Sequence, residues 1–193
     1  MATAAVTARP GQVLADLLPA SRTRDIALVV GGAALTGAAA QLVVPVPGSP
    51  VPVTGQTFAA LLVGTALGTK RGFASLAVYA LVGAAGVPWF QGGTSGWGGA
   101  SFGYVLGMLL AATMVGELAR RGGDRSVLRM AGTMVLGSAV IYAVGVPWLM
   151  ASTGMNLSAA VAAGLVPFLI GDGLKAALAM GALPAAWKLV GRR

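Results

Sequence analysis

Asp172 and Lys175 are the two side chains whose chemistry differs most from their surroundings. They lie three residues apart inside the long apolar stretch 166–190. On a helix this spacing places both side chains on one face, one turn apart. An ionisable side chain at membrane depth costs about 2.5–3.5 kcal/mol on insertion scales and usually faces a bundle interior or a watery cavity. The pair predicts a ligand site, with a purely structural ion pair as the alternative, although such pairs often add little net stability.

Composition places these charges in a membrane protein. The chain has 193 residues, of which 56% are hydrophobic and 9% charged, and its mean hydropathy is +0.83. A soluble domain carries about 25% charged residues. The chain contains no cysteine and no histidine, so the commonest nucleophile, general base and metal ligand are all missing. We therefore expect a single membrane domain that is not an enzyme and has no metal and no cofactor.

Six apolar segments would position the pair, and they predict an all-α membrane protein, a six-transmembrane-helix bundle. A short re-entrant or capping helix is expected near 157–165, and Pro167 suits the first turn of the last segment. Lys70 and Arg71 are read as a tight turn, whereas Gly145 and Pro147 are read as the end of a helix. The segments run at about 26–44, 56–69, 72–85, 101–119, 127–146 and 166–190.

The basic residues predict the topology. Of 13 Lys and Arg residues, all except Lys175 fall in the N-terminal arm, in two alternate connections, or at the C-terminus. By the positive-inside rule these regions are cytoplasmic, together with both termini. The net charge of +8 then reflects topology in the lipid bilayer of the cell membrane, and no nucleic acid is expected as a partner. Residues 1–25 are expected to be a cytoplasmic arm, either a short surface helix or frayed, and residues 26–190 the membrane domain, with a pocket facing outside.

Two further stretches each allow two interpretations. The uncharged loop 86–99 contains six glycines and two tryptophans, which fits either an aromatic anchor at the membrane interface or a loop that covers a ligand. Ala27 and Gly31 in the first segment have the small-xxx-small spacing that lets helix backbones approach closely. This spacing serves either packing inside the bundle or docking of another membrane protein.

Several runs in this chain together resemble the BioY family, the biotin-binding S components of energy-coupling factor (ECF) transporters. The resemblance spans about residues 25–185 and departs at 100–102, where many members have a Gly-Pro-Thr-like stretch. An extra basic residue that some members carry near the binding loops is absent here, so Lys175 is the one obvious cationic partner for a ligand carboxylate. The matching runs are PVPVTGQT at 50–57, LLVG at 61–64, GTKRG at 68–72, GVPWFQGG at 86–93, Gly103-Tyr104, and Pro167-Phe168 followed by Gly171-Asp172 and Lys175.

The resemblance implies six transmembrane helices, capture of biotin from outside, and docking on a transmembrane coupling protein with two ATPases through small residues such as Ala27 and Gly31. In that role Asp172 would accept ureido N–H bonds. Lys175 would pair with the ligand carboxylate or keep Asp172 ionised. Alternatives are an S component for another vitamin, an ion-coupled carrier that uses Asp172, and a non-transporting scaffold. The other expected binding residues are Gln56, Trp89, Phe90, Gly92, Gly93 and Tyr104.

Overall fold

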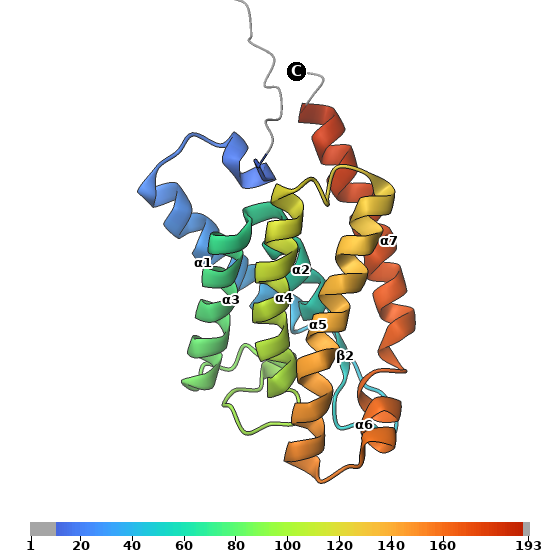
Figure 1. Ribbon diagram of the computed structural model, residues 1–193. Coiled ribbons are helices and arrows are strands. Elements are labelled where there is room, and N and C mark those ends of the chain that lie inside the picture. Colours follow the sequence, from blue (N-terminus) through green and yellow to red (C-terminus); the bar gives the residue numbers. More distant parts are fainter. Residues whose placement is uncertain (1–10, 191–193) are drawn as a thin grey trace, which may run out of the picture.

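The computed structural model describes residues 11–190, and most of them are helical (Figure 1). Two short strands pair antiparallel, with Val43 opposite Thr54. The α-helices of the described chain are α1 (Arg22–Ala39), α2 (Gln56–Leu67), α3 (Thr69–Ala84), α4 (Phe102–Arg120), α5 (Val127–Thr153), α6 (Leu157–Gly164) and α7 (Phe168–Val190). The short elements are the 3-10 helices η1 (Leu14–Leu17) and η2 (Gln91–Gly93) and the strands β1 (Val43–Val44) and β2 (Val53–Thr54).

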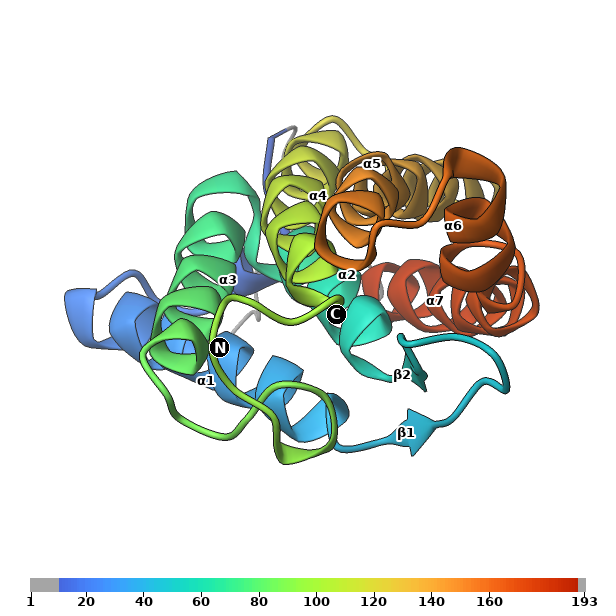
Figure 2. The same cartoon turned by 90° about the horizontal axis from the view of Figure 1, so that it is seen from below.

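Helix α2 lies at the centre of the bundle. It contacts α1, α3, α4, α5 and α7, whereas α6 packs on the end of α5 (Figure 2). Glycines allow the close crossings, because a Cβ atom at Gly64 of α2 would lie 2.4 Å from the carbonyl oxygen of Ala112 on α4. A Cβ atom at Gly107 of α4 would likewise lie 2.7 Å from the carbonyl oxygen of Ile141 on α5. Much of the small-residue spacing in α2 and α4 therefore serves packing inside the bundle.

Three of the described helices, α4, α5 and α7, are long and apolar enough to cross a membrane. Helix α2 is apolar but has only 12 residues, fewer than the ~20 that a perpendicular span needs. The second and third expected segments, 56–69 and 72–85, are likewise shorter than this length. The expected six crossings stay a prediction, since length and composition alone select three helices.

Some helix boundaries differ from those expected. Helix α5 does not end at Val146 but continues through Pro147 to Thr153, and Gly154 ends it in the left-handed conformation with φ 74°. Proline is tolerated inside a membrane helix because neighbouring groups can satisfy the freed carbonyl. Helix α1 ends at Ala39, five residues before Val44, where the first segment was expected to end.

The turn between α2 and α3 is made by Gly68 rather than by Lys70 and Arg71. Gly68 has φ +81°, a conformation that favours glycine, and the two basic residues lie in the first turn of α3. The N-terminal segment is also more ordered than a frayed arm. Val13 and Ala15 are buried and pack with Ala119, while residues 1–10 lie outside the described part of the chain.

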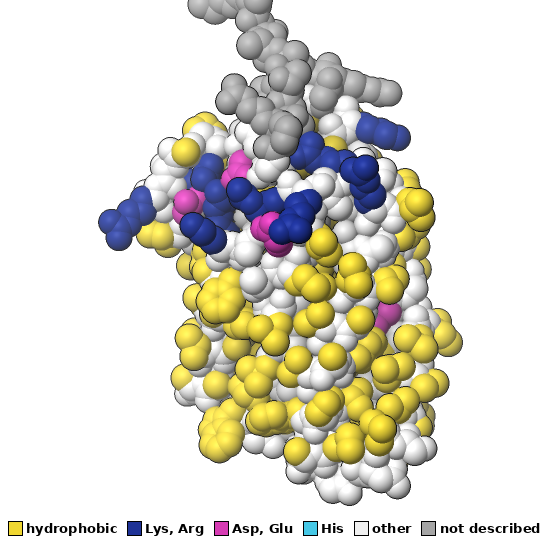
Figure 3. Space-filling view, viewed as in Figure 1, with side chains coloured by type: hydrophobic (Ala, Val, Ile, Leu, Met, Phe, Trp, Pro, Cys, Tyr) yellow, Lys and Arg dark blue, Asp and Glu magenta, His cyan; other side chains and the backbone are white. Residues whose placement is uncertain are grey.

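The described basic residues other than Lys175 gather at one end of the bundle (Figure 3). The 3-10 helix η1 and the last turn of α7 lie at this same end (Figure 1). The remaining surface is mostly apolar, with Ile170 87% and Leu174 66% exposed on α7. This charge distribution is the one that the positive-inside rule predicts for a cytoplasmic end.

A buried carboxylate anchors α7 at the charged end. Trp187 Nε1 of α7 donates a 2.6 Å hydrogen bond to Asp124 Oδ2 in the loop between α4 and α5. The guanidinium of Arg125 lies 3.5 Å from the centre of the Trp187 ring. Burial raises the pKa of Asp124 above its ordinary value, and the contacts with Trp187 and Arg125 offset only part of this shift. Helix α7 is thus fixed at one end, with the Asp172 region farther along it.

Cysteine labelling tests the orientation of the bundle. The chain contains no native cysteine, so single cysteines can be placed at the exposed residues Ser95, in the uncharged loop before α4, and Thr23, at the charged end. In intact cells we expect a membrane-impermeant maleimide to label Ser95→Cys and to label Thr23→Cys only after permeabilisation, since the positive-inside rule predicts that the charged end is cytoplasmic. Labelling of Thr23→Cys from outside, with Ser95→Cys protected, would reverse the proposed topology.

Candidate functional site

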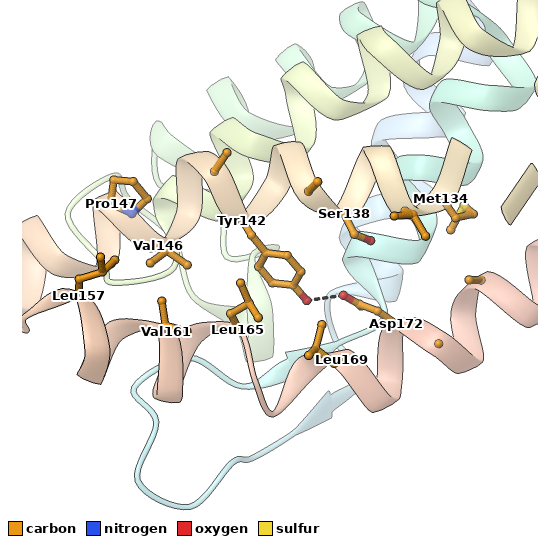
Figure 4. A pocket seen from close by; sticks show the side chains of 15 residues that line it. Met134, Ser138, Tyr142, Val146, Pro147, Leu157, Val161, Leu165, Leu169 and Asp172 are labelled. Atoms are coloured by element: carbon orange, nitrogen blue, oxygen red, sulfur yellow. Dashed lines mark hydrogen bonds between the residues drawn. The ribbon is translucent and has the colours of Figure 1, made fainter. Parts of the chain in front are cut away.

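The Asp172–Lys175 pair forms the centre of a polar bridge between three helices. Lys175 Nζ lies 3.2 Å from Asp172 Oδ1 and donates a 2.7 Å hydrogen bond to Thr57 Oγ1 on α2. The hydroxyl of Tyr142 on α5 donates to Asp172 Oδ2 (Figure 4). The two charged side chains are only 15% and 16% exposed. The bridge therefore ties the middle of α7 to both α2 and α5.

Lys175 faces a small chamber beside this bridge. An ammonium group has three N–H donors, and Thr57 and Asp172 are the two partners that Lys175 has among the described residues. One donor is therefore free for a ligand acceptor. The chamber has a volume of about 20 Å³ and is lined by Val51, Pro52, Thr54, Gln56, Thr57, Ser101, Tyr104, Tyr142, Phe168 and Lys175.

Asp172 faces a different and much larger hollow. This groove of about 710 Å³ runs between α5, α6 and α7 and is mostly apolar (Figure 4). Its residues include Ser138, Leu165 and Leu169 as well as Asp172 and Tyr142. Within residues 11–190, Tyr142 is the one residue that lines both hollows.

Gln56 and Tyr104, two of the expected binding residues, lie in the wall of the chamber. Gln56 Oε1 accepts a 2.8 Å hydrogen bond from the Tyr79 hydroxyl. The Tyr104 hydroxyl donates to the carbonyl oxygen of Gly164 at 2.7 Å, and its ring stacks on Phe168 with centroids 6.3 Å apart. Both residues are nearly fully buried, so the two side chains form a rigid wall around the chamber.

Trp89, Phe90, Gly92 and Gly93 line neither the chamber nor the groove. Trp89 packs over Gly37 of α1, where an added Cβ atom would lie 3.2 Å from its ring. Its Nε1 donates a 3.0 Å hydrogen bond to the carbonyl oxygen of Tyr79. Phe90 occupies a notch at Gly83, is 5% exposed, and packs edge-on against Tyr79 at 5.2 Å.

Gly92 and Gly93 make the turn that follows this pair, with φ of 60° and 79°. This part of the loop therefore packs onto α1 and α3 in the structure. Its connection to the chamber is indirect: Trp89 and Phe90 contact Tyr79, and the Tyr79 hydroxyl donates a hydrogen bond to Gln56 in the chamber wall. Direct contact of these four residues with a ligand stays a prediction.

The small residues of α1 divide into two faces. Ala27, Gly31, Ala34 and Ala38 are exposed, whereas Gly32 is buried. A Cβ atom at Gly32 would lie 2.6 Å from Ser75 Oγ, while one at Gly31 would have nothing within 4 Å. Helix α1 therefore uses one glycine for internal packing and presents Gly31 on a free face, beside a hollow of about 240 Å³ between α1 and α2.

Sequence reasoning missed Tyr142 and Thr57 as members of the bridge. Thr57 belongs to the PVPVTGQT run, which marked the segment but not this contact. Tyr142 stands 30 residues before Asp172 in the chain. Its one available signal was a hydroxyl-bearing side chain inside an apolar segment, since a buried tyrosine hydroxyl usually finds a hydrogen-bond partner.

Comparisons with known proteins give a consistent result. The model of the BioY family matches residues 10–192. A Pyrococcus horikoshii protein named "Probable biotin transporter BioY" is 35% identical over 162 residues, which cover 82% of this chain and 93% of that protein. The "Biotin transporter BioY2" of Lactococcus lactis is 33% identical over 157 residues, covering 80% of this chain and 85% of that protein.

The fold is also similar to that of a solved structure. This is the crystal structure, at 2.1 Å, of the S-component for biotin from an ECF-type ABC transporter. The TM-score is 0.73 at 22% sequence identity, and the match covers 90% of this chain and 94% of the other. The helical arrangement, the apolar segments and the family match over nearly the whole length agree, and the chain belongs to the BioY family.

Proposed function

We propose that this protein is a membrane-embedded, biotin-binding subunit that captures biotin from outside the cell and mediates its uptake with an ECF coupling protein and ATPases. The relatives are named as biotin transporters, and the structural neighbour is the S-component for biotin from an ECF-type transporter. The observation that carries the proposal is the position of Lys175, which lines a chamber together with Tyr104 and Phe168 and has two hydrogen-bond partners, Thr57 and Asp172, among the described residues.

The chemistry of the chamber suits a small acid with a ring system. Lys175 supplies a charge-assisted hydrogen bond to a carboxylate. Tyr104 and Phe168 supply flat apolar surfaces for a thioether ring and an alkyl chain. The side-chain amide nitrogen of Gln56 offers donors for a ureido carbonyl. Few polar groups within apolar walls are typical of small-molecule sites.

The chamber must widen before biotin enters. Its volume of about 20 Å³ suffices for a water molecule but not for a vitamin, whose sites usually measure about 300–1,000 Å³. Val51, Pro52 and Thr54 of the connection between α1 and α2 form one side of the chamber. This connection lies away from the end at which the basic residues gather (Figures 1 and 3). We propose that it moves outward to admit biotin from the outer side.

Asp172 has a supporting role in this proposal. Its two carboxylate oxygens are held by Lys175 and Tyr142, and it lines the groove rather than the chamber. It is therefore placed to orient Lys175 toward the ligand. Direct acceptance of ureido N–H bonds by Asp172 would require its carboxylate to leave Tyr142 and turn into the chamber.

The exposed face of α1 is the proposed docking site for the coupling protein. Ala27 and Gly31 line the hollow between α1 and α2, and their short side chains would let a partner helix approach closely in the membrane. The charged end lies at the cytoplasmic side in this orientation, the side on which ATP is available to the ATPases.

Ligand-dependent melting of the purified protein in detergent tests the proposed function. Binding to the folded state alone stabilises it by about 2.7 kcal/mol at a ligand concentration 100 times Kd. We expect biotin to raise the melting temperature, and thiamine and riboflavin at the same concentration to leave it unchanged. A shift with another vitamin, but none with biotin, would replace the proposed ligand. Uptake that depends on a pH gradient and not on ATPases would favour an ion-coupled carrier.

A further inference from the structure

Tyr142 stands between the two hollows of the protein. It lines both the chamber, which contains Lys175, and the groove between α5, α6 and α7. No other residue of the described chain lines both. Tyr142 packs edge-on against Tyr104, at a centroid distance of 6.4 Å, and contacts the ring of Phe168 at 6.5 Å. Its hydroxyl is held by Asp172, so both ends of the side chain are fixed.

The two hollows differ strongly in size and chemistry. The chamber holds about 20 Å³, and its aromatic and apolar walls carry several polar side chains, among them Gln56, Thr57 and Lys175. The groove holds about 710 Å³ between mainly aliphatic side chains such as Leu165 and Leu169. The Asp172–Lys175 pair crosses the boundary, because Lys175 lines the chamber while Asp172 lines the groove. The Tyr142 ring and this ion pair therefore lie at the boundary between the two hollows.

We propose that Tyr142 is a specificity-determining residue that closes the inner end of the ligand site and so limits the length of ligand that binds. This inference rests on the proposed function. A carboxylate paired with Lys175 lies against the wall, so a substituent added at the carboxylate end must pass into the space that Tyr142 occupies. Free biotin fits, and biotin extended through its carboxyl group is rejected by Tyr142.

The ring and the hydroxyl of Tyr142 have separate roles in this proposal. The ring blocks the passage by its volume. The hydroxyl holds Asp172 on the groove side, which leaves Lys175 as the charged group that faces the ligand. Removal of the ring joins the chamber to the groove, where apolar walls can accommodate an alkyl chain. Removal of the hydroxyl alone keeps the passage closed.

Binding of two neutral ligands of different length tests this inference. Biotin amide and N-butyl biotinamide both lack the carboxylate charge, so their comparison isolates length. We expect wild-type protein to bind N-butyl biotinamide at least about a hundredfold more weakly than biotin amide, and Tyr142→Ala to reduce this ratio to below about tenfold. Tyr142→Phe is expected to keep the wild-type ratio.

Leu165→Ala is the matched control, because it enlarges the groove without touching the chamber, and it should also keep the wild-type ratio. If Tyr142→Ala does not fold, as judged by its melting temperature and gel-filtration profile, Tyr142→Val serves in its place. Equal binding of both ligands by wild type, or continued exclusion by a folded Tyr142 variant that binds biotin amide, would overturn the inference. Absence of biotin binding in wild type would instead overturn the proposed function.

Discussion

Substitution of Lys175 by methionine is expected to weaken biotin binding by about 10- to 150-fold and to change the affinity for biotin amide by less than about threefold. Methionine keeps the length of the side chain and removes the charge. Hydrogen bonds to charged groups contribute about 1.5–3 kcal/mol, and each 1.4 kcal/mol is a factor of ten in affinity. The expectation rests on the place of Lys175 in the lining of the chamber and on its third N–H donor, which has no partner among the described residues. Titration calorimetry on protein in detergent measures both ligands.

Asp172→Asn extends this test to the second member of the pair. The amide keeps the shape and one acceptor but loses the charge that orients Lys175. If Asp172 acts through Lys175, biotin loses more affinity than biotin amide. Equal losses for the two ligands would show that Asp172 contacts the ureido ring, which both share. Unchanged binding with either variant, in protein that remains folded, would contradict the site assignment.

The second large effect is expected at the surface of α1. Gly31→Leu should reduce co-purification of the coupling protein by at least about tenfold, equivalent to about 1.4 kcal/mol, while biotin binding and melting temperature stay unchanged. Gly31 is exposed and an added Cβ atom there has nothing within 4 Å, so the leucine side chain should not disturb the isolated subunit. It should, however, prevent the close approach of a partner helix.

Two other glycines provide controls for this prediction. Gly181 of α7 is also exposed, with nothing within 4 Å of an added Cβ atom, and Gly181→Leu should leave co-purification intact. Gly32→Leu would force the side chain against Ser75 and Val63, so we expect it to destabilise the isolated subunit. Loss of biotin binding in Gly31→Leu, with co-purification preserved, would assign this face to the internal bundle instead.

The sequence was most informative where charge and local spacing determine structure. The i, i+3 spacing of Asp172 and Lys175 predicts two neighbours on one helix face, and the structure pairs them at 3.2 Å. The basic residues likewise predict one charged end of the bundle, which the structure shows. The resemblance to the BioY family is confirmed by the family match over residues 10–192.

Tertiary contacts could not be predicted in this way. Trp89 and Phe90 have aromatic side chains of the kind that line ligand pockets, but their rings pack against Gly37 and Gly83 instead. These contacts depend on how the helices and the loop pack together, which the local sequence does not reveal. Tyr142 joins the site only because α5 packs beside α7. The prediction that α5 ends before Pro147 was wrong. Proline breaks most helices in soluble proteins, but it is tolerated inside a membrane bundle, where neighbouring groups satisfy the freed carbonyl.

The structure of the protein bound to biotin is the most direct test of the account. We predict that biotin lies in a widened chamber between α2, α4, α5 and α7, with its carboxylate within hydrogen-bonding distance of Lys175 Nζ and its rings against Tyr104 and Phe168. The connection that contains Val51 and Pro52 is expected to have moved outward. Biotin found in the groove lined by Leu165 and Leu169, or bound without contact to Lys175, would contradict the account.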